Sequence, residues 1–226
     1  MMALVASCAL GFMVGLRHAM EPDHLAAVST LVAAEPRPRR AALMGAFWGM
    51  GHLFSLLVVG ILLLAFRVQL PERWADGFEL LVAAVLIGLG LRACRKAFIA
   101  RAASARHRLG AMVHSHGADG EHVHVGPLTL AARPLLVGIA HGLAGSGAVT
   151  ALALATMPSA AAAAVFVAVF ALGSVGGMTV LSGVAGLPLE RLARKPRAHA
   201  ALMGAVGALS LVVGACWGVL ALGRLL

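Results

Sequence analysis

The segment Arg17-His18-Ala19-Met20-Glu21-Pro22-Asp23-His24 lies in the middle of an otherwise apolar run that covers residues 3–34. A helix of that length, rising 1.5 Å per residue, is long enough to cross the hydrocarbon layer of a bilayer, which is about 30 Å thick. Each ionised side chain placed inside that layer costs about 3 kcal/mol on insertion scales, so this much polarity needs a partner or a purpose. The segment therefore predicts a membrane helix that carries a polar site.

The rest of the chain repeats the apolar pattern. Hydrophobic residues make up 61% of the chain and charged residues only 12%, and the mean hydropathy of +0.93 excludes a water-soluble domain. Besides residues 3–34, the apolar runs predict spans at 41–66, 75–98, 130–157, 160–187 and 199–223. We therefore expect an all-α, polytopic membrane protein with about six transmembrane helices that form one domain, residues 1–226.

The basic residues indicate how the spans are oriented. The connections after spans one, three and five hold 3, 6 and 4 Lys and Arg residues, 13 in all, whereas the opposite side holds 3. Under the positive-inside rule both termini lie outside and residues 99–127 form a cytoplasmic loop. Because the basic clusters are short and contain almost no aromatic residues, the formal charge of +9 does not indicate a nucleic-acid partner.

Pro22 determines whether the polar side chains of the first span can meet. On a regular helix, residues five and six positions after His18 point about 140° and 240° away from it, so Asp23 and His24 would not converge with it. Proline has no N–H for the carbonyl of His18 and clashes with that carbonyl, so the helix should break or kink near Pro22. We expect the break to free the His18 carbonyl oxygen and to turn His18, Asp23 and His24 toward one point.

Two more histidines lie at comparable depth, His52 near the centre of span 41–66 and His141 near the centre of span 130–157. Each alone would fit a histidine hydrogen-bonded to a neighbouring helix, but imidazoles on three spans beside Asp23 favour a cation site. Imidazole and carboxylate without thiolate suit nickel, cobalt or zinc. We expect the metal ligands to be His18, Asp23, His24, His52 and His141, with Glu21, Glu79, Ser146 and Ser174 as further candidates for ligands or pathway residues.

A short internal repeat is present. Residues 14–18, Val-Gly-Leu-Arg-His, match residues 137–141, Val-Gly-Ile-Ala-His, in two spans that would run in opposite directions. This favours an inverted repeat of three plus three helices, with a binding site between the halves near the midplane. A competing observation is that Ala-Ala-Leu-Met-Gly-Ala occurs at 41–46 and at 200–205, in spans that run the same way, so chance similarity in an Ala- and Gly-rich chain is the alternative.

Five of the ten histidines lie between spans three and four: His107, His114, His116, His122 and His124. His-rich tracts bind borderline metals with modest geometry. A disordered connector is the other interpretation, and the two are compatible. We expect this loop to buffer or sense metal rather than to perform transport, with His114, His116, His122 and His124 as its binding residues.

The pattern His18-x4-Asp23-His24 resembles the signature of the nickel/cobalt transporter family. The segments Trp48-Gly49-Met50-Gly51-His52 and 141–147, His-Gly-Leu-Ala-Gly-Ser-Gly, are similar to its short branch, the urease-accessory membrane proteins of UreH type. The resemblance covers most of the chain and implies a six-helix carrier for nickel or cobalt, with His18, Asp23 and His24 as the matching motif positions. Glu21 departs from the pattern of the longer family members, in which an aspartate is commoner at this position.

We therefore expect a permease in the inner (plasma) membrane of a bacterium that moves a divalent metal ion, most simply nickel or cobalt, as its substrate. No catalytic cofactor is expected, and no GxxxxGK[ST] motif for nucleotide hydrolysis occurs in the sequence. The alternatives are a membrane metal sensor or accessory protein for maturation of a nickel enzyme, with a cytoplasmic metallochaperone as partner, and an intramembrane metalloenzyme. The sequence contains no HExxH motif of zinc proteases, and it leaves the oligomeric state and the direction of transport open.

Overall fold

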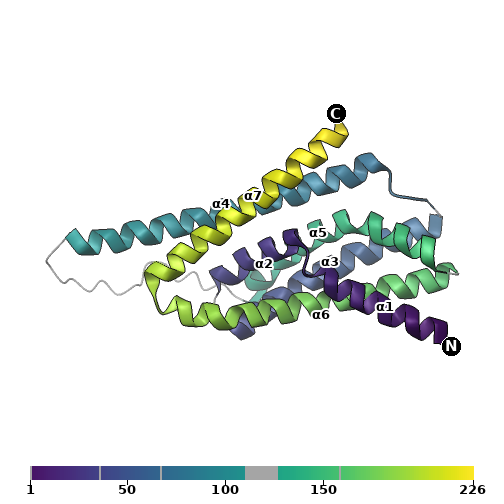
Figure 1. Ribbon diagram of the computed structural model, residues 1–226, viewed down its shortest axis with the longest axis horizontal. Helices are drawn as coiled ribbons and strands as arrows, with labels where there is room; N and C mark the ends of the chain where they lie inside the picture. The colour runs from purple at the N-terminus through teal and green to yellow at the C-terminus, as the bar shows by residue number, and fades with distance from the viewer. Residues whose placement is uncertain (1, 36, 67, 110–126, 158) are drawn as a thin grey trace.

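The computed structural model describes residues 2–35, 37–66, 68–109, 127–157 and 159–226, which form seven helices and contain no strand (Figure 1). All-helical architecture is thus confirmed. The helices are α1 (Met2–His18), α2 (Pro22–Ala34), α3 (Pro38–Phe66), α4 (Glu72–Leu109), α5 (Pro127–Thr156), α6 (Ala160–Ala193) and α7 (Pro196–Leu225).

The first apolar run is broken where Pro22 predicts a break. α1 ends at His18 and α2 begins at Pro22, a position that suits proline because the first helical N–H has no acceptor within the helix. The predicted free carbonyl at His18 is wrong, however. That oxygen accepts a hydrogen bond from the backbone N–H of Glu21 at 3.0 Å, because the chain closes a tight turn before the proline.

Helix lengths agree with membrane crossing for much of the chain. Four stretches are long and apolar enough to cross a bilayer, at Pro38–Leu63, Glu72–Arg101, Ala161–Ala193 and Pro196–Leu225. α1 and α2 have 17 and 13 residues, and neither is among these stretches of the described chain. α4 continues past residue 98 to Leu109, so the first part of the stretch expected as a loop is helical. The predicted metal-binding residues His114, His116, His122 and His124 lie outside the described residues.

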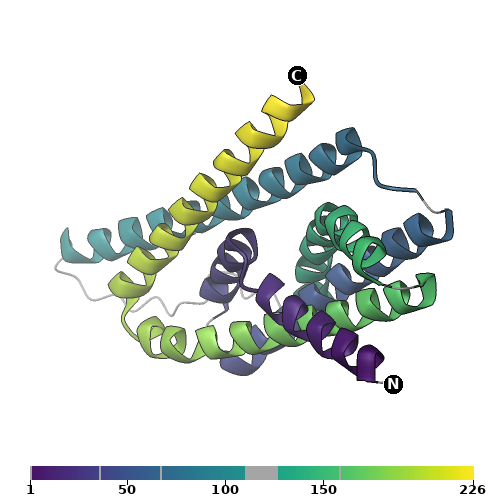
Figure 2. The same ribbon diagram turned by 45° about the vertical axis from the view of Figure 1, so that its right-hand side comes forward.

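The helices form two groups with α2 between them. α4 and α7 pack along each other on one side, and α1, α3, α5 and α6 pack together on the other (Figures 1 and 2). α2 contacts members of both groups. The two termini lie toward the right of Figure 1, whereas the C-terminal end of α4 and the start of α7 lie toward the left.

Glycine allows the inner helices to approach closely. Where α1 crosses α6, a Cβ on Gly15 would collide with the carbonyl oxygen of Phe170, and one on Gly173 would collide with the carbonyl oxygen of Phe12. Close approach of backbones at small residues is a usual way of packing membrane helices, since lipid offers no hydrophobic drive for association. These contacts set the spacing of α1 and α6.

The crossing of α3 with α5 has the same construction. A Cβ on Gly138 would collide with the carbonyl oxygen of Trp48, and one on Gly51 would collide with the carbonyl oxygen of Leu135. The helix that holds His52 is thereby fixed against the helix that holds His141.

α4 and α7 cross at Gly90 and Gly207. A Cβ on either glycine would lie 2.7 Å or 2.9 Å from the carbonyl oxygen of the other. Ser210 donates a hydrogen bond to the carbonyl of Leu86 at 2.8 Å and adds a polar link to this pair.

We predict that Gly138→Ala lowers the unfolding temperature of the purified protein, because the added methyl group forces α3 and α5 apart at a cost of about 1–3 kcal/mol. Gly88→Ala is the matched control, since Gly88 lies in the interior of α4 with nothing within 4 Å of an added Cβ. That change should leave the protein unaffected or stabilise it by up to about 1 kcal/mol through helix propensity. Equal effects of the two changes, measured by thermal unfolding in detergent, would contradict the packing described above.

Candidate metal centre

Four histidines from four helices come together at the α1–α2 break. His18 is the last residue of α1, His24 lies in the first turn of α2, and His52 and His141 lie within α3 and α5. The ring of His24 lies 4.5 Å from that of His18, 5.4 Å from that of His52 and 5.2 Å from that of His141, centre to centre. All four are buried.

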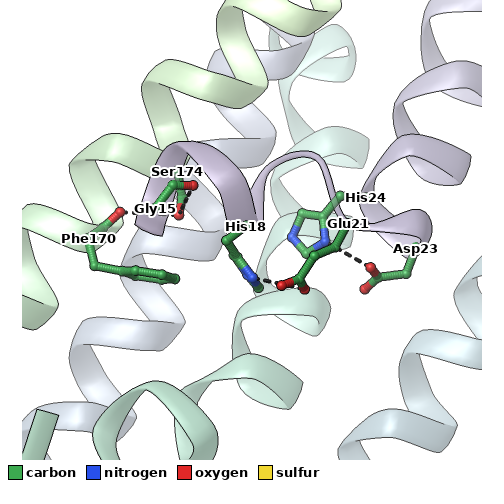
Figure 3. Close-up of polar contacts among 7 residues, drawn as sticks. All are labelled: Gly15, His18, Glu21, Asp23, His24, Phe170 and Ser174. Atoms are coloured by element: carbon green, nitrogen blue, oxygen red, sulfur yellow. Dashed lines mark hydrogen bonds and ion pairs between the residues drawn. The ribbon is translucent and has the colours of Figure 1, made fainter. Parts of the chain in front are cut away.

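Oxygen acceptors orient three of the four rings. The Nδ1 atoms lie within hydrogen-bonding distance of one oxygen each: His18 to Glu21 at 2.9 Å, His24 to Asp23 at 3.2 Å (Figure 3) and His141 to the carbonyl of Val137 at 3.0 Å. An ionised carboxylate or a carbonyl can only accept, so Nδ1 carries the proton, and in the neutral ring the lone pair of Nε2 is then free to bind a metal. Such oxygens are the usual outer partners of metal-binding histidines.

The remaining ring nitrogens have no partner. Among the described residues, Nε2 of His18, His24 and His141 and both ring nitrogens of His52 are buried without a hydrogen bond. A buried polar atom left unpaired costs about 1–3 kcal/mol, so a cluster of five is not explained by folding stability. One cation bound by the lone pairs would satisfy several of them at once.

The geometry suits a metal ion of the borderline class. His18, His24 and His52 can each offer one nitrogen, with these three atoms within 4.8 Å of one another. A second group with the same property consists of Glu21, Asp23 and His24, which shares His24 with the first. Imidazole with carboxylate is a donor set for Ni²⁺, Co²⁺ or Zn²⁺, and Asp23 and Glu21 bring negative charge beside neutral rings.

A cavity of 310 Å³ reaches one of the four histidines, His18, and is also lined by Val14, Arg17, Glu21, Gly145 and Phe170. Trp48 packs against His24 and His141, with ring centres 5.3 Å and 5.6 Å away, within a buried apolar cluster. Trp48 was not among the predicted site residues. Its position four residues before His52, on the same face of one helix, is the signal that could have identified it.

Three other predicted residues have different surroundings. The hydroxyl of Ser174 donates to the carbonyls of Gly15 and Phe170, each at 3.2 Å, and so links α1 to α6 (Figure 3). Glu79 forms an ion pair with Arg224 of α7, which also bonds the buried Asp76 at 2.6 Å. This α4–α7 ion pair was not predicted. Ser146 lies in α5, and its side chain is not among those that the structure describes.

Comparison with known proteins gives one family match and two similar proteins. Residues 4–196 match the model of the family NicO, described as high-affinity nickel-transport protein. The urease accessory protein UreH of Bacillus sp. (strain TB-90) is 33% identical over 93% of this chain and 90% of its own length. The chloroplast protein FOR GROWTH AND FERTILITY 2 of Arabidopsis thaliana is 26% identical over 80% of this chain but only 48% of its own. No solved structure matches.

We predict that His52→Leu removes the rise in unfolding temperature that Ni²⁺ causes, while the metal-free protein stays as stable or becomes more stable. Leucine fills a similar volume and replaces two unpaired buried nitrogens. The matched control is His199→Leu, because His199 is bonded to the carbonyl of Ala33 at 3.0 Å and belongs to no metal-ligating group among the described residues. A nickel-induced shift that survives in the His52 variant would rule out this centre.

Proposed function

The chain belongs to the NicO family of high-affinity nickel-transport proteins, and we propose that it carries Ni²⁺ across the membrane through a site formed by His18, Asp23, His24, His52 and His141. Metal-ion transport follows from family membership. The observation that supports this particular site is the convergence of five unpaired imidazole nitrogens from four helices at one break in the chain. Cobalt is the second candidate substrate, since the same donors suit it.

In this proposal Asp23 acts through charge as much as through contact. Four neutral imidazoles offer lone pairs but no charge, whereas a dication leaving water needs compensation inside the membrane. The Asp23 carboxylate lies against His24 and belongs to the second ligating group with Glu21. A metal ion could therefore pass from the carboxylate pair to the buried histidines with His24 as a common ligand.

Uptake is the direction that needs no separate energy source. An inside-negative potential of about 100 mV supplies about 4.6 kcal/mol for inward movement of a dication, twice the value for a single charge. The cavity at His18 is lined by residues of α1, α5 and α6, and α1 begins at the end of the bundle where the termini lie. With both termini outside, as the basic residues predict, this cavity would receive ions from the outer side.

We further propose that the seven helices make six membrane crossings in two inverted halves, with α1–α2, α3 and α4 equivalent to α5, α6 and α7. The packing supports it: Gly15 lies on Phe170 of α6, and Gly138 lies on Trp48 of α3. Between the halves Gly15 corresponds to Gly138 and Phe170 to Trp48, so each contact maps onto the other. His18 and His141 then face the centre from equivalent positions.

The relative named as a urease accessory protein supports a second role, delivery of nickel to enzyme maturation. A transporter can serve that role by importing the metal, and a cytoplasmic metallochaperone would then receive it. Membership of a transporter family argues against an enzyme. We propose that His114, His116, His122 and His124 buffer the metal on the cytoplasmic side and tune its uptake.

We predict that the purified protein in liposomes moves radioactive Ni²⁺ down an imposed inside-negative potential. Flux should fall by orders of magnitude in Asp23→Asn, which keeps an oxygen acceptor for His24 but removes the charge. His199→Leu should transport normally and serves as the control. A protein that binds nickel without moving it would be an accessory protein, and near-normal flux in both the Asp23 and His52 variants would place the pathway elsewhere.

Orientation is tested by labelling single cysteines in a protein in which Cys8, Cys94 and Cys216 are replaced. We predict that Val68→Cys, in the connection between α3 and α4, reacts with an impermeant reagent in intact cells. Ala118→Cys should react only after the cells are opened, because the 13 basic residues place that side inside. The reverse pattern would invert the orientation and with it the direction assigned to the cavity at His18.

A further inference from the structure

A second cavity, separate from the histidine centre, lies among α2, α3, α4, α5 and α7. Its volume is 220 Å³. Three basic side chains line it, Arg92 and Lys96 from α4 and Arg133 from α5, and its apolar walls include Leu31, Met44, Leu89 and Met203. We call this the basic cavity.

The protein offsets the positive charge of the basic cavity only in part, through the one carboxylate of its lining, Glu35, which attracts Lys96. Within the described part of the chain, Arg92, Lys96 and Arg133 make no hydrogen bond or ion pair. Glu35 also lines the cavity, but it is already paired with Arg37 at 3.2 Å and Arg40 at 3.6 Å. Three basic groups around one hollow repel each other, so the arrangement favours an anionic ligand.

The transported metal does not suit this cavity. A dication would be repelled by the three basic groups, and the lining contains no histidine. Arginine and lysine together are the usual ligands of phosphate groups, since guanidinium donates in pairs and ammonium adds a point charge. The ligand is therefore expected to carry phosphate.

The surroundings favour a phosphate that is attached to acyl chains. A neighbouring hollow lined by Arg92, Arg95, Lys96 and Ile99 opens beside two of the same basic residues on α4. Next to it Phe98 is 74% exposed and Leu91 57% exposed, as lipid-facing side chains would be. The acyl chains of a lipid whose headgroup occupies the basic cavity could thus lie along this apolar surface of α4.

We propose that the basic cavity binds the phosphate headgroup of an anionic phospholipid from the cytoplasmic leaflet, the leaflet being assigned by the orientation proposed above. Basic pockets between membrane helices on that side are suited to such headgroups. The lipid would bridge α4 and α5, the helices on either side of residues 110–126, and would offset the repulsion among Arg92, Lys96 and Arg133. It would stabilise this end of the protein without contacting the metal.

The test uses the full chain in nanodiscs of phosphatidylcholine, with or without phosphatidylglycerol, and counts retained lipids by native mass spectrometry. The variant Arg92→Gln/Lys96→Gln/Arg133→Gln removes the three positive charges that line the basic cavity. The variant Arg191→Gln/Arg194→Gln/Arg197→Gln is the matched control, because it removes three charges near the α6–α7 connection, at the same end of the bundle and outside the cavity. Lys96→Gln alone serves if the triple variant does not fold.

We expect wild type and the control to retain phosphatidylglycerol in preference to phosphatidylcholine, and the cavity variant to lose that preference by tenfold or more. Its nickel-induced shift in unfolding temperature should persist, which separates this proposal from the metal site. Equal loss in both triple variants would mean general surface attraction and would overturn the proposal. If inorganic phosphate stabilises the protein in phosphatidylcholine nanodiscs as much as phosphatidylglycerol does, the ligand is a soluble phosphate. That result would overturn the lipid assignment.

Discussion

The break between α1 and α2 is the constraint on which the site depends. Pro22 lacks the N–H that a continuous helix would need, so the chain turns after His18 and starts again with a proline at the first position of α2. This turn brings the rings of His18 and His24 to 4.5 Å from each other, which six positions on one straight helix would not allow. The same turn places Glu21 and Asp23 where each can orient the histidine nearest to it.

The other two histidines depend on the close packing of glycine. Gly138 and Gly51 let α3 and α5 approach until backbone meets backbone, and this spacing carries His52 and His141 to the broken helix. The cluster that results is costly without a ligand, because buried nitrogens remain unpaired. A role in transport explains this buried cluster better than folding stability does. This agrees with the membership of the chain in a nickel-transport family.

The two cavities differ in the charged groups that line them. The one that reaches His18 is lined by one carboxylate, Glu21, and one guanidinium, Arg17, beside an imidazole that can bind a metal cation. The basic cavity holds Arg92, Lys96 and Arg133, so an anion is favoured there. Because opposite charges attract strongly where little water is present, placing the two sites apart would keep a headgroup phosphate from drawing the transported ion away from the histidines.

Composition and periodicity were sufficient to predict an all-helical membrane protein, and the local rule for proline was sufficient to predict the break near Pro22. Both follow from short-range physics, the transfer of apolar side chains and one missing N–H. Only the tertiary structure decided which polar atoms of distant helices meet: Glu79 pairs with Arg224, and Ser174 links α1 to α6. Those outcomes depend on how distant helices cross, and the crossings depend on glycine contacts between residues 84 to 161 positions apart, which no local pattern in the chain specifies.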